Sequence, residues 1–289
     1  MIRSPIVAGT FYDASPQACE QTARAMLADA HLPDDTPDGC VGGLVPHAGW
    51  VCSGTVAAMT FNALTRDATE SAFVLLGASH APTGSAGLLF DQGAWETPLG
   101  EVAVEDQLAA AIARDCPSVQ VDCRAHGREH SLEVQLPFIQ VLRPEARIVP
   151  ILAPPGADAA ELGRQIGAVL ADWTPRPVVI GSTDLTHYGP RYGITPAGVG
   201  MRGIEWAMDN DRELLKLIEA MDADRIVEHT NRTHSACGGG AIAATMTACQ
   251  ALGATSAAVL RHTNSYETLK AFNPNDTSHA VGYSSVVFA

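Results

Sequence analysis

Short apolar segments alternate with longer helix-like segments along almost the whole chain, and this alternation restricts the fold more than any other feature of the sequence. Most of the short segments are nearly continuous runs of apolar residues, which is typical of strands buried on both faces of a sheet. They are residues 43–46, 72–77, 146–152, 177–182, 257–263 and 280–288. The sequence therefore predicts an α/β fold, a three-layer sandwich with a mainly parallel or mixed central sheet and helices on both faces.

The helix-like segments lie between these strands, and the first of them opens with Ser15 and Pro16, a capping residue followed by proline at the first helical position. The expected helices are residues 15–30, 53–65, 105–114, 129–142, 157–171, 202–220 and 238–252. Residues 86–104 instead resemble a hairpin or an extended excursion. Because no linker or low-complexity tract interrupts the pattern, we expect one domain that spans residues 1–289.

The charge and apolar composition of the chain exclude several classes of partner. There are 32 acidic and 18 basic residues, and the basic ones are scattered. A net charge of −14 repels nucleic acid and anionic membranes, so we expect neither as a partner. No apolar run approaches the roughly 20 residues of a membrane span, and the first residues lack the apolar region of a secretory signal. The seven cysteines form no pairing pattern, so we expect reduced thiols and a cytoplasmic protein.

Histidines follow three of the apolar segments within a few residues. They are His47, His80 and His187. The loops at the carboxyl ends of parallel strands converge, and ligands of α/β sheets collect there. Two imidazoles that project from neighbouring strand ends are a good start for a divalent metal site. The alternative is that His47 and His80 are separate loop histidines, each satisfied by a hydrogen bond.

Asp184 and His187 stand three residues apart in the segment STDLTHYG, residues 182–189. A histidine that is held by a carboxylate beside a metal suits general acid–base catalysis near neutral pH. His187 is alternatively a third metal ligand. Asp184 is alternatively the side-chain cap of a helical turn, which is a common position for aspartate.

Cys237 precedes three glycines, residues 238–240, and then a predicted helix. The dipole and free N–H groups of a helix N-terminus lower the pKa of a thiol and so favour a thiolate, which is both a metal ligand and a nucleophile. The glycines allow a ligand or an anion to approach the backbone closely. The alternative is a buried thiol beside a glycine-rich helix contact.

His130 and Glu133 share one face of the helix expected for REHSLEVQLPF, residues 128–138, because they lie three residues apart. Leu132, Leu136 and Ile139 supply an apolar face to the same segment. The polar pair is therefore expected to point into a site, with a solvated helix face as the alternative.

Six segments in this order make the chain resemble the Memo-like family, which includes the prokaryotic proteins labelled AmmeMemoRadiSam system protein B. They are SPIVAGTFYD, VPHAGWVCSG, LLGASH, REHSLEVQLPF, STDLTHYG and ACGGGAI, and they extend to about residue 245. The last predicted strand, which contains Tyr283, fits the family as well.

The resemblance implies a site similar to that of class III extradiol dioxygenases, the non-haem iron enzymes of the protocatechuate 4,5-dioxygenase type. Through the matching motifs, His47 and His80 correspond to the two histidine ligands, and Cys237 falls where the carboxylate ligand is expected. His187 corresponds to the histidine that acts as acid and base, with Asp184 beside it. The residues expected around these groups are His130, Glu133 and Gly238.

The same resemblance implies a non-haem, dioxygenase-like oxidoreductase with Fe(II) and a small, phenolic substrate. A thiolate in place of a carboxylate makes the site softer, so copper and zinc are alternatives. A different class of function is a non-catalytic protein that binds a phosphopeptide or a metal on the same fold. A third is a zinc hydrolase in which His187 is the base. The family label also implies association with a radical-SAM protein.

Overall fold

A mixed sheet forms the centre of the computed structural model, which describes residues 1–66, 71–80 and 84–289. Its strands are β2 (Gly42–Val45), β3 (Ala72–Gly77), β4 (Gly87–Leu89), β7 (Val119–Val121), β8 (Arg147–Leu152), β9 (Val178–Ser182), β10 (His187–Tyr188), β11 (Ala257–Asn264) and β12 (Ala280–Phe288). They lie in the order β10-β12-β2-β9-β3-β8-β4-β7, and β11 pairs with β12. The mixed α/β architecture expected from the sequence is confirmed.

Four neighbouring strands in the middle of the sheet, β2, β9, β3 and β8, are parallel. The strands on either side of them, β12 and β4, run antiparallel to β2 and β8, respectively. All residues of β2, β3 and β9 are buried, which explains their continuous apolar sequence. Because the four central strands point the same way, the loops after them gather at one edge of the sheet.

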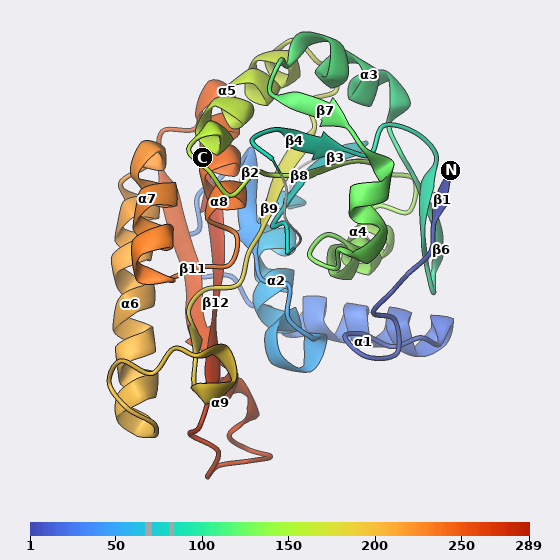
Figure 1. Cartoon of the computed structure of the whole chain (residues 1–289). Coiled ribbons are helices and arrows are strands. Elements are labelled where there is room, and N and C mark those ends of the chain that lie inside the picture. Colours follow the sequence, from blue (N-terminus) through green and yellow to red (C-terminus); the bar gives the residue numbers. More distant parts are fainter. Residues whose placement is uncertain (67–70, 81–83) are drawn as a thin grey trace.

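Helices cover both faces of the sheet. One group consists of α1 (Pro16–Asp29), α2 (Trp50–Leu64) and α4 (Leu136–Leu142), and the other of α5 (Asp158–Ala171), α7 (Ala223–Thr233) and α8 (Gly239–Ala251). In Figure 1, α7 lies to the left of β11 and β12, whereas α1, α2 and α4 lie to the right of these two strands. Two adjacent glycines of β2 face the two helix groups. A Cβ on Gly43 would meet Thr60 of α2, and a Cβ on Gly42 would meet Cys249 of α8. The remaining helices are α3 (Asp106–Asp115), α6 (Met201–Glu219) and α9 (Ser265–Leu269).

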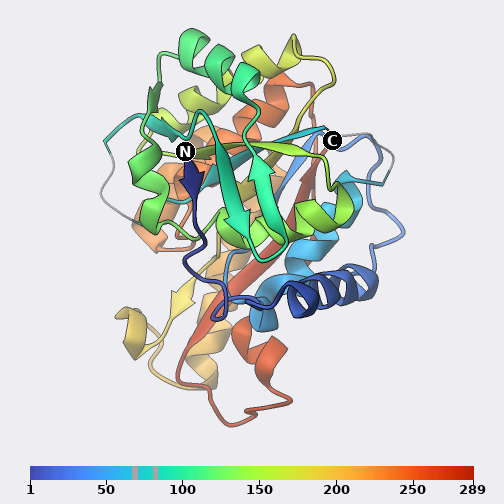
Figure 2. The ribbon, with the colours of Figure 1, turned by 90° about the vertical axis from the view of Figure 1, so that its right-hand side faces the viewer.

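A second, three-stranded sheet lies along one side of the molecule. It contains β1 (Ile2–Arg3), β5 (Ala94–Thr97) and β6 (Gly100–Ala103). Strands β5 and β6 form the hairpin expected within residues 86–104, and Figure 2 shows β1 in dark blue beside it. A bridge between Val104 and Ile148 connects this hairpin to the central sheet.

The helix expected over residues 129–142 is wrong in its first part. Glu129 has an extended backbone, residues 133–135 form a 3-10 turn, and α-helix begins only at Leu136. Pro137 lies in the first turn of α4, where its missing N–H costs no helical hydrogen bond. The positions of His130 and Glu133 are therefore set by tertiary contacts rather than by helical spacing.

Across the parts of the chain that the structure describes, no helix is both long and apolar enough to cross a bilayer.

Candidate metal centre

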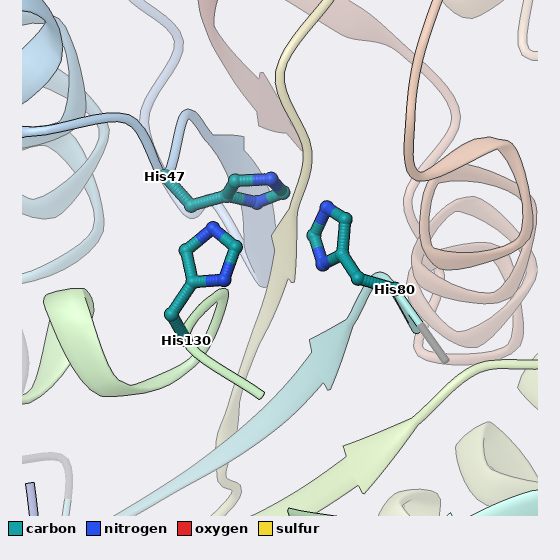
Figure 3. A group of neighbouring side chains, drawn as sticks. All are labelled: His47, His80 and His130. Atoms are coloured by element: carbon teal, nitrogen blue, oxygen red, sulfur yellow. The ribbon is translucent and has the colours of Figure 1, made fainter. Parts of the chain in front are cut away.

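Three histidine rings meet at the edge of the sheet where the central parallel strands end. His47 follows β2 by two residues and His80 follows β3 by three, whereas His130 lies in the segment just before α4. Their ring centroids are 4.7–5.4 Å apart, and one ligand nitrogen from each ring lies within 4.8 Å of the other two. Figure 3 shows the rings pointing toward one another. The convergence expected for His47 and His80 is present, and the third member is His130.

His47 is buried and its ring is oriented by Ser182, whose Oγ lies 3.1 Å from Nδ1. The Ser182 hydroxyl donates its own proton to the carbonyl of Ser131 at 2.7 Å, so toward His47 it is an acceptor. Nδ1 of His47 therefore carries the proton, and Nε2 keeps its lone pair. Burial, reinforced by the nearby His80 and His130, lowers the pKa of His47 well below its ordinary value. A neutral imidazole with a free Nε2 is the form that binds metals.

Glu129, which was not among the expected site residues, orients His80. Its carboxylate lies 3.0 Å from Nδ1 of His80 and also accepts the His80 backbone N–H at 2.9 Å. The hydrogen bond to Glu129 raises the pKa of His80. Although burial opposes ionisation of the carboxyl group, the bond to His80 lowers the pKa of Glu129 to about 2. Metal-binding histidines usually donate their second ring N–H to a carboxylate, a backbone carbonyl or a water, and a bond from Nδ1 leaves Nε2 for the metal.

His130 is partly buried and is held mainly by ring contacts. It stacks on His80 at 4.7 Å and meets Phe11 edge-on at 5.1 Å. Burial and the neighbouring His80 lower the pKa of His130. His130 was expected to lie around the ligands, and the structure places it among the candidate ligands themselves.

Cys237 lies beside this group, with its Sγ 3.2 Å from Nε2 of His47. Its backbone N–H donates to the carbonyl of Asp184, and Gly238 after it donates to the Thr183 hydroxyl. Burial, followed by the charge of Asp184, raises the pKa of the Cys237 thiol. This direction is opposite to the one expected for a thiol at a helix N-terminus, because the cost of desolvating a thiolate exceeds the effect of the helix dipole.

Asp184 and His187 have separate partners. The buried Asp184 carboxylate accepts the backbone N–H of His47 at 2.7 Å, so it fixes the loop after β2 instead of capping a turn of its own segment. Nδ1 of His187 lies 3.0 Å from the carbonyl of Leu185. A carbonyl only accepts, so Nδ1 carries the proton and Nε2 of the neutral ring is the proton-accepting atom. The ring of Tyr192 packs edge-on against His187 at 4.9 Å.

Glu133 holds the N-terminal segment in place. Its fully buried carboxylate accepts from the Arg3 guanidinium at 2.5 Å, the backbone N–H groups of Ile6 and Val7 at 3.0 Å, and the Tyr12 hydroxyl at 2.9 Å. These four donors occupy its acceptor positions, so its contacts are structural rather than contacts with the histidines.

The donor set fits a transition metal better than magnesium or calcium. Three imidazole nitrogens and a neighbouring sulfur are borderline to soft ligands, which suit iron, copper and zinc, whereas magnesium and calcium prefer oxygen. The His80 side chain is 38% exposed, so the group opens to solvent on that side.

Comparison with known proteins relates nearly the whole chain to one family. The sequence profile of the family described as Memo-like protein matches residues 3–287. A MEMO1 family protein of Methanopyrus kandleri is 37% identical over 100% of this chain and 99% of its own length. MEMO1 family proteins of Methanothermobacter thermautotrophicus and Thermococcus onnurineus are 35% and 34% identical, over 98% and 100% of this chain and 99% of their own lengths.

Proposed function

Because the chain belongs to the Memo-like family, we propose that it is a metal-dependent, dioxygenase-like oxidoreductase that acts on a small phenolic molecule. His47 and His80 hold the metal, with iron as the first candidate and copper or zinc as alternatives. The third donor comes from Cys237 or His130. The observation that carries this proposal is the convergence of three imidazoles whose ligand nitrogens lie within 4.8 Å of one another.

The contacts behind two of the rings support metal binding. Ser182 and Glu129 each engage a Nδ1 atom, so the Nε2 atoms of His47 and His80 are left as the ligand atoms. Orienting partners of this kind typically change metal affinity by about 10–100-fold when they are removed. A redox-active metal in this position supplies Lewis acidity and electron transfer to a bound substrate.

His187 is the proposed base. Its Nδ1–H is engaged by the Leu185 carbonyl, so Nε2 is free to take a proton from the hydroxyl of a phenol. The aromatic ring of Tyr192 beside it offers an apolar surface to a planar substrate. Asp184 acts through the loop after β2, where it fixes the backbone of His47.

Metal content tests the proposal. Protein purified without oxygen is analysed by plasma mass spectrometry for the wild type and for His47→Ala, His80→Ala, His130→Ala and Cys237→Ser, with the exposed His31→Ala as the matched control. We expect near-stoichiometric iron in the wild type and in His31→Ala. We expect its loss in His47→Ala and His80→Ala. The response of His130→Ala and Cys237→Ser identifies the third donor.

Oxygen uptake across a panel of catechols then tests the reaction. Uptake by the iron-loaded wild type that is lost in His187→Gln at unchanged iron content supports the oxidoreductase. Zinc in place of iron, with turnover that continues without oxygen, refutes it in favour of a hydrolase. Absence of metal even after reconstitution refutes the metal site and directs the search to a phosphopeptide partner.

A further inference from the structure

A buried carboxylate outside the metal centre has no role in the chemistry described so far. Asp211 lies on α6, and its side chain is only 1% exposed. Burying a carboxylate is costly unless charged or hydrogen-bonding groups compensate it. Its Oδ2 lies 3.0 Å from Nε2 of His262 on β11, and its Oδ1 accepts the backbone N–H of Thr186 at 2.9 Å.

The second of these contacts connects α6 to the segment that carries Asp184 and His187. The adjacent residue on α6, Asn210, donates to the Thr186 hydroxyl at 3.0 Å and to the Thr233 carbonyl at 3.1 Å. Two successive side chains of α6 therefore bind Thr186, one through its backbone and one through its hydroxyl.

Strand β12 holds the same segment through backbone hydrogen bonds. Gly282 donates to the Thr186 carbonyl at 3.0 Å, and its own carbonyl accepts the Leu185 N–H at 2.8 Å. A Cβ on Gly282 would lie 2.0 Å from Oδ2 of Asp211. The strand can pass this close to the carboxylate only because residue 282 has no side chain.

The N–H that Asp211 accepts and the carbonyl that His187 binds belong to one peptide group. This group joins Leu185 to Thr186, and its C=O lies 3.0 Å from Nδ1 of His187. A trans peptide is planar, with its N–H and C=O pointing in opposite directions, so it cannot turn at one end without turning at the other. A carboxylate on the N–H also polarises the group, which makes its carbonyl a better acceptor.

We propose that Asp211 is a positioning residue that sets the tautomer of His187 through the Leu185–Thr186 peptide group. With the carbonyl fixed toward Nδ1, the proton stays on Nδ1 and Nε2 remains the accepting atom. The use of His187 as a base rests on the proposed function, whereas its tautomer is a property of this chain alone.

Nitrogen NMR of histidine-labelled protein measures the tautomer directly. Spectra are recorded at alkaline pH, where imidazoles are neutral, and His187→Gln identifies the signals of His187. Asp211→Asn keeps an oxygen for the Thr186 N–H, and we expect it to retain the Nδ1–H form. Asp211→Leu removes the acceptor in a similar volume, and we expect the ratio of Nδ1–H to Nε2–H to fall by about tenfold, as for the loss of one hydrogen bond to a charged group.

Asn210→Ala is the matched control, because it loosens Thr186 but leaves the peptide group bound to Asp211. We expect it to leave the tautomer of His187 unchanged even where it lowers the melting temperature. The inference is overturned if Asp211→Leu keeps the Nδ1–H form, or if Asn210→Ala changes the tautomer as much as Asp211→Leu does. Asp211→Ala replaces the leucine variant if that protein does not fold.

Metal content of the same variants separates this inference from the proposed function. The candidate ligands lie on other segments, so we expect Asp211→Leu to retain the metal of the wild type. A wild-type protein without metal refutes the proposed function, and the NMR result still decides the role of Asp211.

Discussion

Replacement of Glu133 by glutamine distinguishes a structural role from a role at the metal centre. Glu133 is fully buried and pairs with Arg3, whose side chain is 4% exposed. The change leaves the guanidinium buried without its counter-charge, and breaking a buried ion pair in this way typically costs about 3–5 kcal/mol. Glutamine keeps one oxygen that can accept from Ile6 or Val7, so we expect the lower end of that range. A loss of about 3 kcal/mol corresponds to a decrease of about 6–12 °C in Tm.

Urea unfolding of the metal-free protein, followed by tryptophan fluorescence, measures this loss without a contribution from metal binding. Glu20→Gln is the matched control, because it breaks an exposed ion pair with Arg24, and we expect it to cost less than about 0.5 kcal/mol. A cost below about 1 kcal/mol for Glu133→Gln refutes the reasoning. If Glu133→Gln loses metal at unchanged stability, the reasoning is also refuted, and Glu133 belongs to the metal centre.

Three further predictions follow from individual contacts. Glu129→Gln removes the carboxylate from His80, and we expect metal binding, measured by competition with a chelator, to weaken about 10–100-fold. Burial lowers the pKa of His126 from 6.5 to about 4, so the neutral ring stabilises the fold above pH 6.5 and that contribution is lost as the pH falls toward 4. Urea unfolding should show wild type losing about 3 kcal/mol more than His126→Gln between pH 7 and pH 4. Gly282→Ala should cost about 1–3 kcal/mol in the same assay, whereas Gly127→Ala, which has open space around it, should cost little.

The local pattern of the sequence was sufficient to predict the main strands and most helices. Strands β3 and β12 have the predicted bounds, and β2, β8, β9 and β11 differ from prediction by one residue at an end or are shifted by one. Continuous apolar runs with helix-like segments between them leave few arrangements besides a covered sheet. Helices α7 and α9 and the short strands β1, β7 and β10 were not predicted, because they are short or depend on pairing partners far away in the chain.

The same pattern placed His47 and His80 at strand ends, where a shared site was expected. The helix predicted around His130 was wrong in its first part, and yet His130 lies in the group. Proximity to His47 and His80 comes from the packing of its segment beside the sheet, which no local spacing encodes.

The partners of the site residues were decided by the tertiary structure alone. Glu129 binds a histidine 49 residues away, Asp184 binds the backbone of His47 across 137 residues, and Glu133 binds Arg3 across 130. The hydrogen bonds of a helix and the residue preferences of a turn involve positions only a few residues apart. The sequence by itself therefore determined the helices, the strands and the loops in which the histidines lie. Burial and long-range contacts act only after the chain has folded. They decided which partner each of the three carboxylates binds, and burial raised the pKa of the Cys237 thiol.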